Sequence, residues 1–212
     1  MSIRIPKYSL AEELINSISH GLCGIFSIVA LVLMLVKATT ALQYVTVSIF
    51  GTTMILLYVI SCIYHALSPR LTGKKVLRVL DHCNVFLLVF GTYIPIVLLG
   101  VGGSLGWWMF AFVAIVSIIG ITFSAINTDR FQVLEVVCHL LNGWSILIGL
   151  PQLLEHMHFG GVLLLLLGGI SYSIGAILYG IGARRKYMHS VFHFLCIVGT
   201  VLQWLSIYLY LL

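Results

Sequence analysis

The sequence predicts an all-α membrane protein, a seven-transmembrane helix bundle with its N-terminus in the cytoplasm and its C-terminus outside. Hydrophobic residues make up 61% of the 212 residues, and charged residues make up only 8%. Because soluble domains carry about 25% charged residues, this chain could not cover itself with a polar surface. Apolar stretches set the number of spans, and the distribution of Lys and Arg sets the orientation.

The apolar stretches are separated by polar residues, Gly or Pro, and each is close to the roughly 20 residues that span a bilayer. We expect transmembrane helices at 20–36, 42–65, 81–99, 105–123, 132–150, 161–180 and 188–211. Little of the chain remains for a soluble domain. We therefore expect one domain, 1–212, with a short cytoplasmic segment, 1–19, that has no pattern of a cleaved signal peptide.

The segments between these stretches carry their own signals. Ser9-x-x-Glu12 is a capping-box pattern, which predicts a juxtamembrane helix before the first span. The loop 66–80, between the second and third spans, holds the densest charge. Pro95 and Pro151 lie near the ends of the third and fifth spans, where a missing N–H costs least. The sixth span is rich in glycine, which allows close packing of helices.

Basic residues predict the orientation of the bundle. Ten of the eleven Lys and Arg residues fall on one side if the N-terminus and the even-numbered loops share that side. These ten are Arg4, Lys7, Arg70, Lys74, Lys75, Arg78, Arg130, Arg184, Arg185 and Lys186. Cytoplasmic loops carry such an excess, so this side is expected in the cytoplasm of a multi-pass cell membrane protein. The net charge of +5 suits anionic lipids as partners and is not a signal for nucleic acid.

Polar residues gather at the cytoplasmic ends of several expected spans. His65 ends the second span, with Ser61 one turn deeper on the same face, and Asp81 opens the third. His189 opens the seventh span, and His193 lies one turn deeper on the same face. A further set with i, i+3, i+7 spacing, whose role is open, stands at the start of the first span: Glu13, Asn16 and His20.

Two histidines four residues apart on a helix present two imidazoles to one point. Together with His65, His189 and His193 would form a three-histidine set, and zinc with three protein ligands and water is a catalytic pattern. Asp81 would hold the water, and Ser61 would hydrogen-bond beside the ligands. A bound metal lowers the pKa of water to roughly 7, which provides a nucleophile at neutral pH.

Structural interpretations of the same residues stay open. The two histidines of the seventh span would also suit hydrogen bonds to lipid headgroups or loop carbonyls. Asp81 could pair with Arg78 across one turn or cap the third span. His82 faces about 100° away from Asp81 on a helix, so we interpret it as structural or interfacial. His139, in the fifth span without a matching partner, is interpreted as a satisfied core histidine.

The blocks EELINSISH, SCIYHAL, LDHCNVFLLVFGTYIPI, GGISYSIGAILYG and MHSVFHFLCIVGTVLQW resemble, in this order, the bacterial haemolysin III family. That family is related to the progestin and adiponectin receptors, in a wider group with the alkaline ceramidases. The resemblance covers roughly residues 10–210. At one position the chain departs from it, because Gln203 stands where many bacterial members carry His. Gln203 lies about 15 Å of helix beyond His193, so it should not touch the metal.

The resemblance implies seven spans, a cytoplasmic N-terminus and a zinc ion near the cytoplasmic face. By motif, it assigns the zinc to His65, His189 and His193. Asp81 matches the family aspartate that contacts water at the zinc, and Ser61 matches the serine beside the site. Relatives in this group are associated with lipid amide hydrolysis, with receptor signalling and, by the family name, with haemolysis.

Two classes of function are compatible with the sequence. The oligomeric state stays open. The first is a zinc-dependent hydrolase acting on a lipid amide or ester, in which Asp81 orients or deprotonates water and Ser61 supports the oxyanion or the metal. No second acid is clearly placed to protonate a leaving amine, and Glu13 qualifies only if the first span faces the site. The second is a non-enzymatic regulator with a structural zinc, or a pore-forming cytolysin. Retinal is disfavoured because the seventh span has no lysine, and two histidines on one face suit a small ion better than haem.

Overall fold

The computed structural model describes residues 5–182 and 185–212 of the chain. Its helices are α1 (Leu10–Lys37), α2 (Ala41–Ala66), α3 (Thr72–Pro95), α4 (Gly103–Asn127), α5 (Gln132–Trp144), α6 (Leu150–His156), α7 (Phe159–Gly182) and α8 (Met188–Tyr210). A π-helix, Ile96–Val101, continues α3, and a 3₁₀ turn, Ser145–Gly149, joins α5 to α6. Within these residues, seven helical stretches are long and apolar enough to cross a membrane, which confirms the predicted fold class.

The first transmembrane helix begins earlier than expected, at Leu10, so most of the segment 1–19 is helical. The predicted capping box explains this start. The Ser9 hydroxyl accepts from the Glu12 N–H at 3.3 Å, and the Glu12 carboxylate accepts from the Ser9 N–H at 2.8 Å. The cap therefore opens the transmembrane helix itself, and residues 5–9, the described part of the chain before it, form no separate juxtamembrane helix.

The third helix also begins earlier than expected, at Thr72, inside the charged segment 66–80. Two of its charges, Lys74 and Arg78, are buried. Buried charges need partners, and these two are paired with acids from other parts of the chain. The charge density therefore belongs largely to the first turns of α3, and the predicted loop 66–80 ends at Leu71.

The fifth span is interrupted and longer than expected. The α-helix ends at Trp144, a 3₁₀ turn follows, and α6 carries the span on to His156. Pro151 stands in the first turn of α6, where its missing N–H would have no helical partner anyway. It therefore restarts a helix inside the span, whereas the sequence placed it beyond the end of the span.

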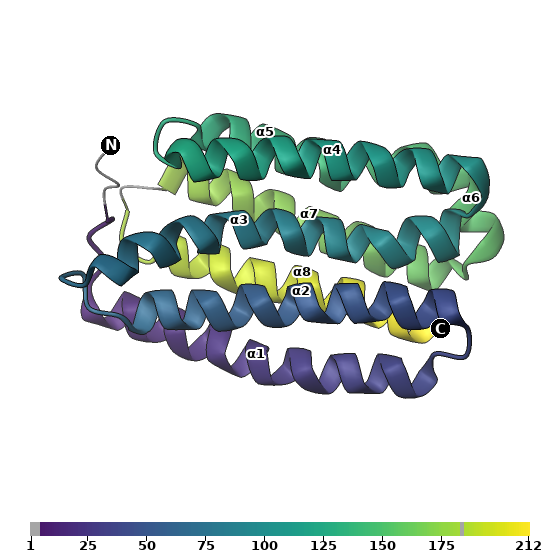
Figure 1. Ribbon diagram of the computed structural model, residues 1–212, viewed down its shortest axis with the longest axis horizontal. Helices are drawn as coiled ribbons and strands as arrows, with labels where there is room; N and C mark the ends of the chain where they lie inside the picture. Colours follow the sequence, from purple (N-terminus) through teal and green to yellow (C-terminus); the bar gives the residue numbers. More distant parts are fainter. Residues whose placement is uncertain (1–4, 183–184) are drawn as a thin grey trace.

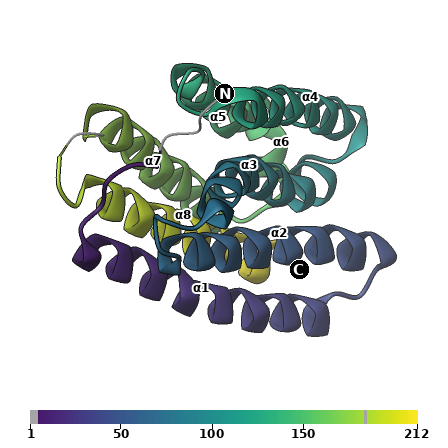
Figure 2. The same ribbon diagram turned by 60° about the vertical axis from the view of Figure 1, so that its left-hand side comes forward.

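The spanning helices form a ring (Figures 1 and 2). Consecutive spans pack against each other, α5 packs on α7, and α8 closes the ring against α1. Close packing needs small residues in places: a Cβ added at Gly91 of α3 would collide with Thr53 of α2. Large apolar side chains such as Leu22, Trp108 and Val133 are exposed on the outside, as expected of faces that contact lipid.

One end of the ring collects the polar groups. The start of α1, the end of α2 and the starts of α3 and α8 lie together at the left of Figure 1, and α8 ends at the opposite side. This end contains most of the described basic residues, in the segment before α1, in loops and in the first turns of α3, whereas Lys37 ends α1 on the other side. Two of the ten basic residues counted in the sequence, Arg4 and Arg184, lie outside the described residues. The cytoplasmic orientation stays a prediction.

Candidate metal centre

Two helices bring the three candidate ligands to the polar end of the ring. His65 is the last residue but one of α2, and His189 and His193 occupy the first turns of α8. The start of α8 is fixed from outside the helix. Tyr187 takes a left-handed conformation with φ +63°, and its N–H donates to the Glu12 carboxylate at 2.6 Å. Glu12, which completes the capping box of α1, therefore also holds the backbone where α8 begins.

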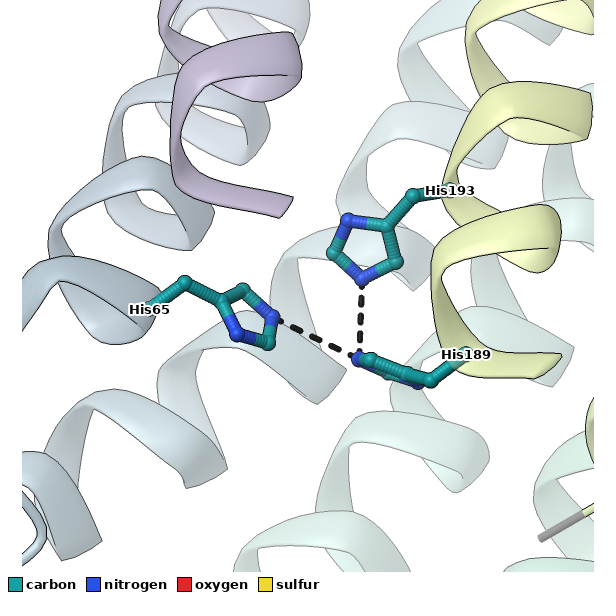
Figure 3. A group of neighbouring side chains, drawn as sticks. All are labelled: His65, His189 and His193. Carbon is teal, nitrogen blue, oxygen red and sulfur yellow. Dashed lines mark hydrogen bonds between the residues drawn. The ribbon is translucent and has the colours of Figure 1, made fainter. Parts of the chain in front are cut away.

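The three imidazoles point their Nε2 atoms toward one another (Figure 3). His189 Nε2 lies 3.4 Å from His65 Nε2 and 2.9 Å from His193 Nε2. All three candidate ligand atoms lie within 4.8 Å of one another. Nitrogens bound to one zinc at about 2.0–2.1 Å in a tetrahedral arrangement lie roughly 3.3 Å apart. Converging nitrogen lone pairs repel unless a cation or a proton lies between them, so this group is able to hold a metal ion.

His65 is held by a chain of charged groups that reaches across three helices. Its Nδ1 lies 2.6 Å from Glu13 Oε2, and Lys74 Nζ donates to Glu13 Oε1 at 2.5 Å. Lys74 Nζ also donates to the Leu67 carbonyl at 2.9 Å. A carboxylate accepts the Nδ1 proton of His65, which leaves Nε2 with a free lone pair for a metal. The first span therefore does face the site, and Glu13 is engaged there as an acceptor.

Asp81 and Ser61 are both buried and line one cavity beside the histidines. Ser61 Oγ makes no hydrogen bond of good geometry to the described residues, although it lies close enough to the Asp81 carboxylate to interact with it. A buried hydroxyl without such a bond is costly, so this atom favours a bound water or substrate oxygen in the cavity.

Asp81 lies nine residues into α3, so the prediction that it opens or caps the helix is wrong. Arg78, the alternative partner considered for Asp81, donates to Asp129 through both terminal nitrogens.

Aromatic contacts enclose the three histidines. Tyr8, just before α1, stacks on His189 with ring centroids 4.9 Å apart, and burial raises the pKa of its hydroxyl. His20 of α1 stacks on His193 with centroids 3.9 Å apart. Both ring nitrogens of His20 are buried without a partner among the described residues. Sequence reasoning missed Tyr8, although its place directly before the Ser9 cap is a signal that could have found it.

A cavity of about 130 Å³ extends from this centre into the ring. Six helices line it, α1, α2, α3, α5, α7 and α8, and most of its lining is apolar. Such a volume is enough for several water molecules, since each needs at least roughly 10–15 Å³. His193 lines it near the start of α8, and Gln203 lines it ten residues further along the same helix. The arrangement can therefore place an elongated apolar ligand beside the histidines and the carboxylate.

Two further histidines line the same cavity. His82, interpreted from the sequence as structural or interfacial, places Nδ1 3.0 Å from Glu135 Oε2. His139 stacks on Phe86 with centroids 3.8 Å apart, and its Nδ1 is buried without a partner among the described residues. We interpreted His139 as a core histidine with its hydrogen bonds satisfied, and for Nδ1 this is wrong.

Comparison with known proteins gives matches over nearly the whole chain. A family model described as haemolysin-III related matches residues 8–204. Hemolysin-3 of Bacillus cereus is 33% identical over 205 residues, which cover 95% of this chain and 92% of that protein. The Hemolysin-3 homolog of Bacillus subtilis (strain 168) is 32% identical over 206 residues, 96% of each chain.

A more distant similarity reaches a human protein. Monocyte to macrophage differentiation factor of Homo sapiens is 21% identical over 209 residues, which cover 94% of this chain and 84% of that protein. The range matched by the family model contains the three histidines at the centre, together with Ser61 and Asp81.

Proposed function

Because this chain belongs to the haemolysin III-related family, we propose that it is a zinc-dependent hydrolase that cleaves a lipid amide or ester within the cell membrane. The observation that carries the proposal is the convergence of three Nε2 atoms beside a largely apolar cavity that also contains a buried carboxylate. Nitrogen ligands suit zinc, and a set of three protein ligands leaves a position open for catalysis.

A bound zinc would polarise a substrate carbonyl and activate water at neutral pH. Asp81 orients the attacking water and takes one of its protons. Ser61 Oγ, which makes no hydrogen bond of good geometry to the described residues, donates to the oxygen that gains negative charge. Glu13 keeps the Nδ1 proton on His65 and so keeps Nε2 available. Tyr8, stacked on His189, covers the centre from the end of the bundle.

The cavity supports a lipid as the substrate. Its walls are mostly apolar and would receive an acyl chain, while the reacting carbonyl lies at the polar end of the ring beside Ser61 and Asp81. Basic residues flank this end, so we place it at the cytoplasmic face by the positive-inside rule. Anionic headgroups there would be attracted by the same charges.

The names of the Bacillus relatives favour a second candidate, a haemolysin. The protein would then act on membranes as a cytolysin. The other non-enzymatic candidate is a regulator whose zinc holds α2 and α8 together. A pore needs a polar path through the whole bundle. The candidate site residues gather at one end, and the cavity walls beyond them are mostly apolar, so hydrolysis is the better supported function.

The test is to purify the protein in detergent without added metal, to count metals by elemental analysis, and to supply N-acyl sphingoid and phospholipid substrates. About one zinc per chain with chelator-sensitive release of fatty acid is the expected result. Zinc without turnover on any of these lipids would favour the regulator. Leakage of vesicles by zinc-free protein would favour the cytolysin.

A further inference from the structure

A second polar group faces the cavity from its α3–α5 side. His82 of α3 and Glu135 of α5 both line the cavity and lie together, with Nδ1 and Oε2 3.0 Å apart. The other oxygen of Glu135 accepts from the Ser124 hydroxyl of α4 at 2.6 Å. Glu135 is 5% exposed and Ser124 is fully buried. Three helices thus contribute to one carboxylate–histidine pair.

The contacts of Glu135 decide which nitrogen of His82 is available. A carboxylate accepts hydrogen bonds, so the proton of His82 lies on Nδ1 in the neutral ring. Nε2 is then the nitrogen that can take up and release a proton. A carboxylate behind Nδ1 also stabilises the imidazolium that forms, as in the histidine–aspartate part of a catalytic triad. The Ser124 hydroxyl holds the carboxylate in place for this role.

Hydrolysis of an amide needs such a group. The water that attacks the carbonyl gives up a proton, for which Asp81 is placed, but the departing nitrogen must gain one before the C–N bond breaks. His82 directly follows Asp81 on α3, about 100° further around the helix, and both line the cavity. The two groups therefore lie at neighbouring positions of one helix, where one bound substrate can reach both.

We propose that His82, held by Glu135, is the general acid that protonates the leaving nitrogen, an inference that rests on the proposed hydrolase function. The C–O bond to water forms and one proton of the water passes to Asp81. His82 starts as the imidazolium beside Glu135 and gives its Nε2 proton to nitrogen as the C–N bond breaks, which leaves the neutral ring with its proton on Nδ1. The proton on Asp81 returns through water to His82. The net reaction adds one water to the amide and yields a fatty acid and an amine.

Two other groups near the site are less suited to act as this acid. Glu13 lies against His65 Nδ1 and Lys74 Nζ. His139 also lines the cavity, but its ring stacks on Phe86 and its buried Nδ1 has no hydrogen-bond partner among the described residues. His82 differs from these two: a carboxylate lies at its Nδ1, its Nε2 is not part of that contact, and both His82 and Glu135 line the cavity.

The test compares two substrates with the same acyl chain, an alkyl amide and a 4-nitrophenyl ester. Nitrophenolate leaves without protonation, whereas an alkyl amine does not. His82→Gln should lower kcat for the amide about 10²–10⁴-fold and leave the ester rate and both KM values nearly unchanged. Glu135→Gln should lower the amide rate selectively as well. His139→Gln is the matched control and should leave the ratio of the two rates as in the wild type.

Two readouts separate catalysis from a structural role. Metal content and the affinity for a fluorescent fatty acid should be the same in His82→Gln and the wild type. Equal loss on both substrates, or no loss on the amide, would overturn the role of His82 and leave the hydrolase intact. A wild type that cleaves neither substrate removes the hydrolase and this acid with it. If His82→Gln does not fold, the ratio of amide to ester rates in Glu135→Gln tests the same role.

Discussion

Replacement of Glu13 by Gln is expected to weaken zinc binding about 10- to 100-fold, the usual effect of losing a carboxylate that orients a metal-binding histidine. That range equals about 1.4–2.8 kcal/mol. The reason is the 2.6 Å contact between Glu13 Oε2 and His65 Nδ1. Glutamine keeps an acceptor in place but loses the charge that makes the His65 ring a stronger ligand. The affinity is measured by competition with a chromophoric chelator in detergent.

The same substitution has a second effect that must be separated from the first. The side chain of Lys74 is completely buried, and its ammonium donates to Glu13 at 2.5 Å. Without the carboxylate this ammonium keeps the Leu67 carbonyl and the Tyr64 ring, whose centroid lies 5.1 Å away. Breaking one side of a buried ion pair costs up to about 3–5 kcal/mol, so the metal-free protein should melt at a lower temperature.

A double variant distinguishes the two effects. Glu13→Gln combined with Lys74→Met should recover much of the lost stability, because the unpaired ammonium is gone, but it should not recover zinc affinity. Asp129→Asn removes a charge from the ion pair with Arg78 at the same end and serves as the control. Zinc affinity should be unchanged in that control. Wild-type affinity in Glu13→Gln would refute the assigned role of Glu13.

Three further substitutions and one control, His139→Ala, test the centre. His189→Ala should remove tightly bound zinc and His139→Ala should not, by elemental analysis after dialysis; full zinc content in His189→Ala contradicts the ligand assignment. Asp81→Asn should keep zinc and lose lipid hydrolysis, and turnover at the wild-type rate would exclude Asp81 from proton transfer. Ser61→Ala should lower kcat by about 10²–10³-fold with little change in KM, as for loss of one oxyanion donor, and an effect on KM alone would assign Ser61 to substrate binding instead.

Local patterns predicted those parts of the molecule that depend on helix periodicity. Apolar stretches located seven spans, and the four-residue spacing of His189 and His193 places both on one face of α8. His65 joins them because α2 ends where α8 begins, which follows from the alternating direction of consecutive spans. The Ser9–Glu12 cap was also predicted, since both residues belong to one turn.

Pairings between distant helices were not predictable from one sequence. Lys74 and Arg78 were assigned to a charged loop because their partners, Glu13 and Asp129, are far away along the chain. His82 was assigned by its angle to Asp81 on one helix, which says nothing about the carboxylates of other helices. Its partner in α5 is 53 residues away. Tertiary packing thus determines which charged side chains are buried and which histidine is hydrogen-bonded to a carboxylate.

The most direct measurement is the zinc X-ray absorption spectrum of the purified protein, together with the zinc content of the same sample. One zinc per chain is expected, with a nitrogen and oxygen shell at about 2.0–2.1 Å and imidazole scattering that weakens in His193→Ala. Five free cysteines offer the chain other ligands. A sulfur shell at about 2.3 Å, or a spectrum that His193→Ala leaves unchanged, would contradict a centre built from His65, His189 and His193.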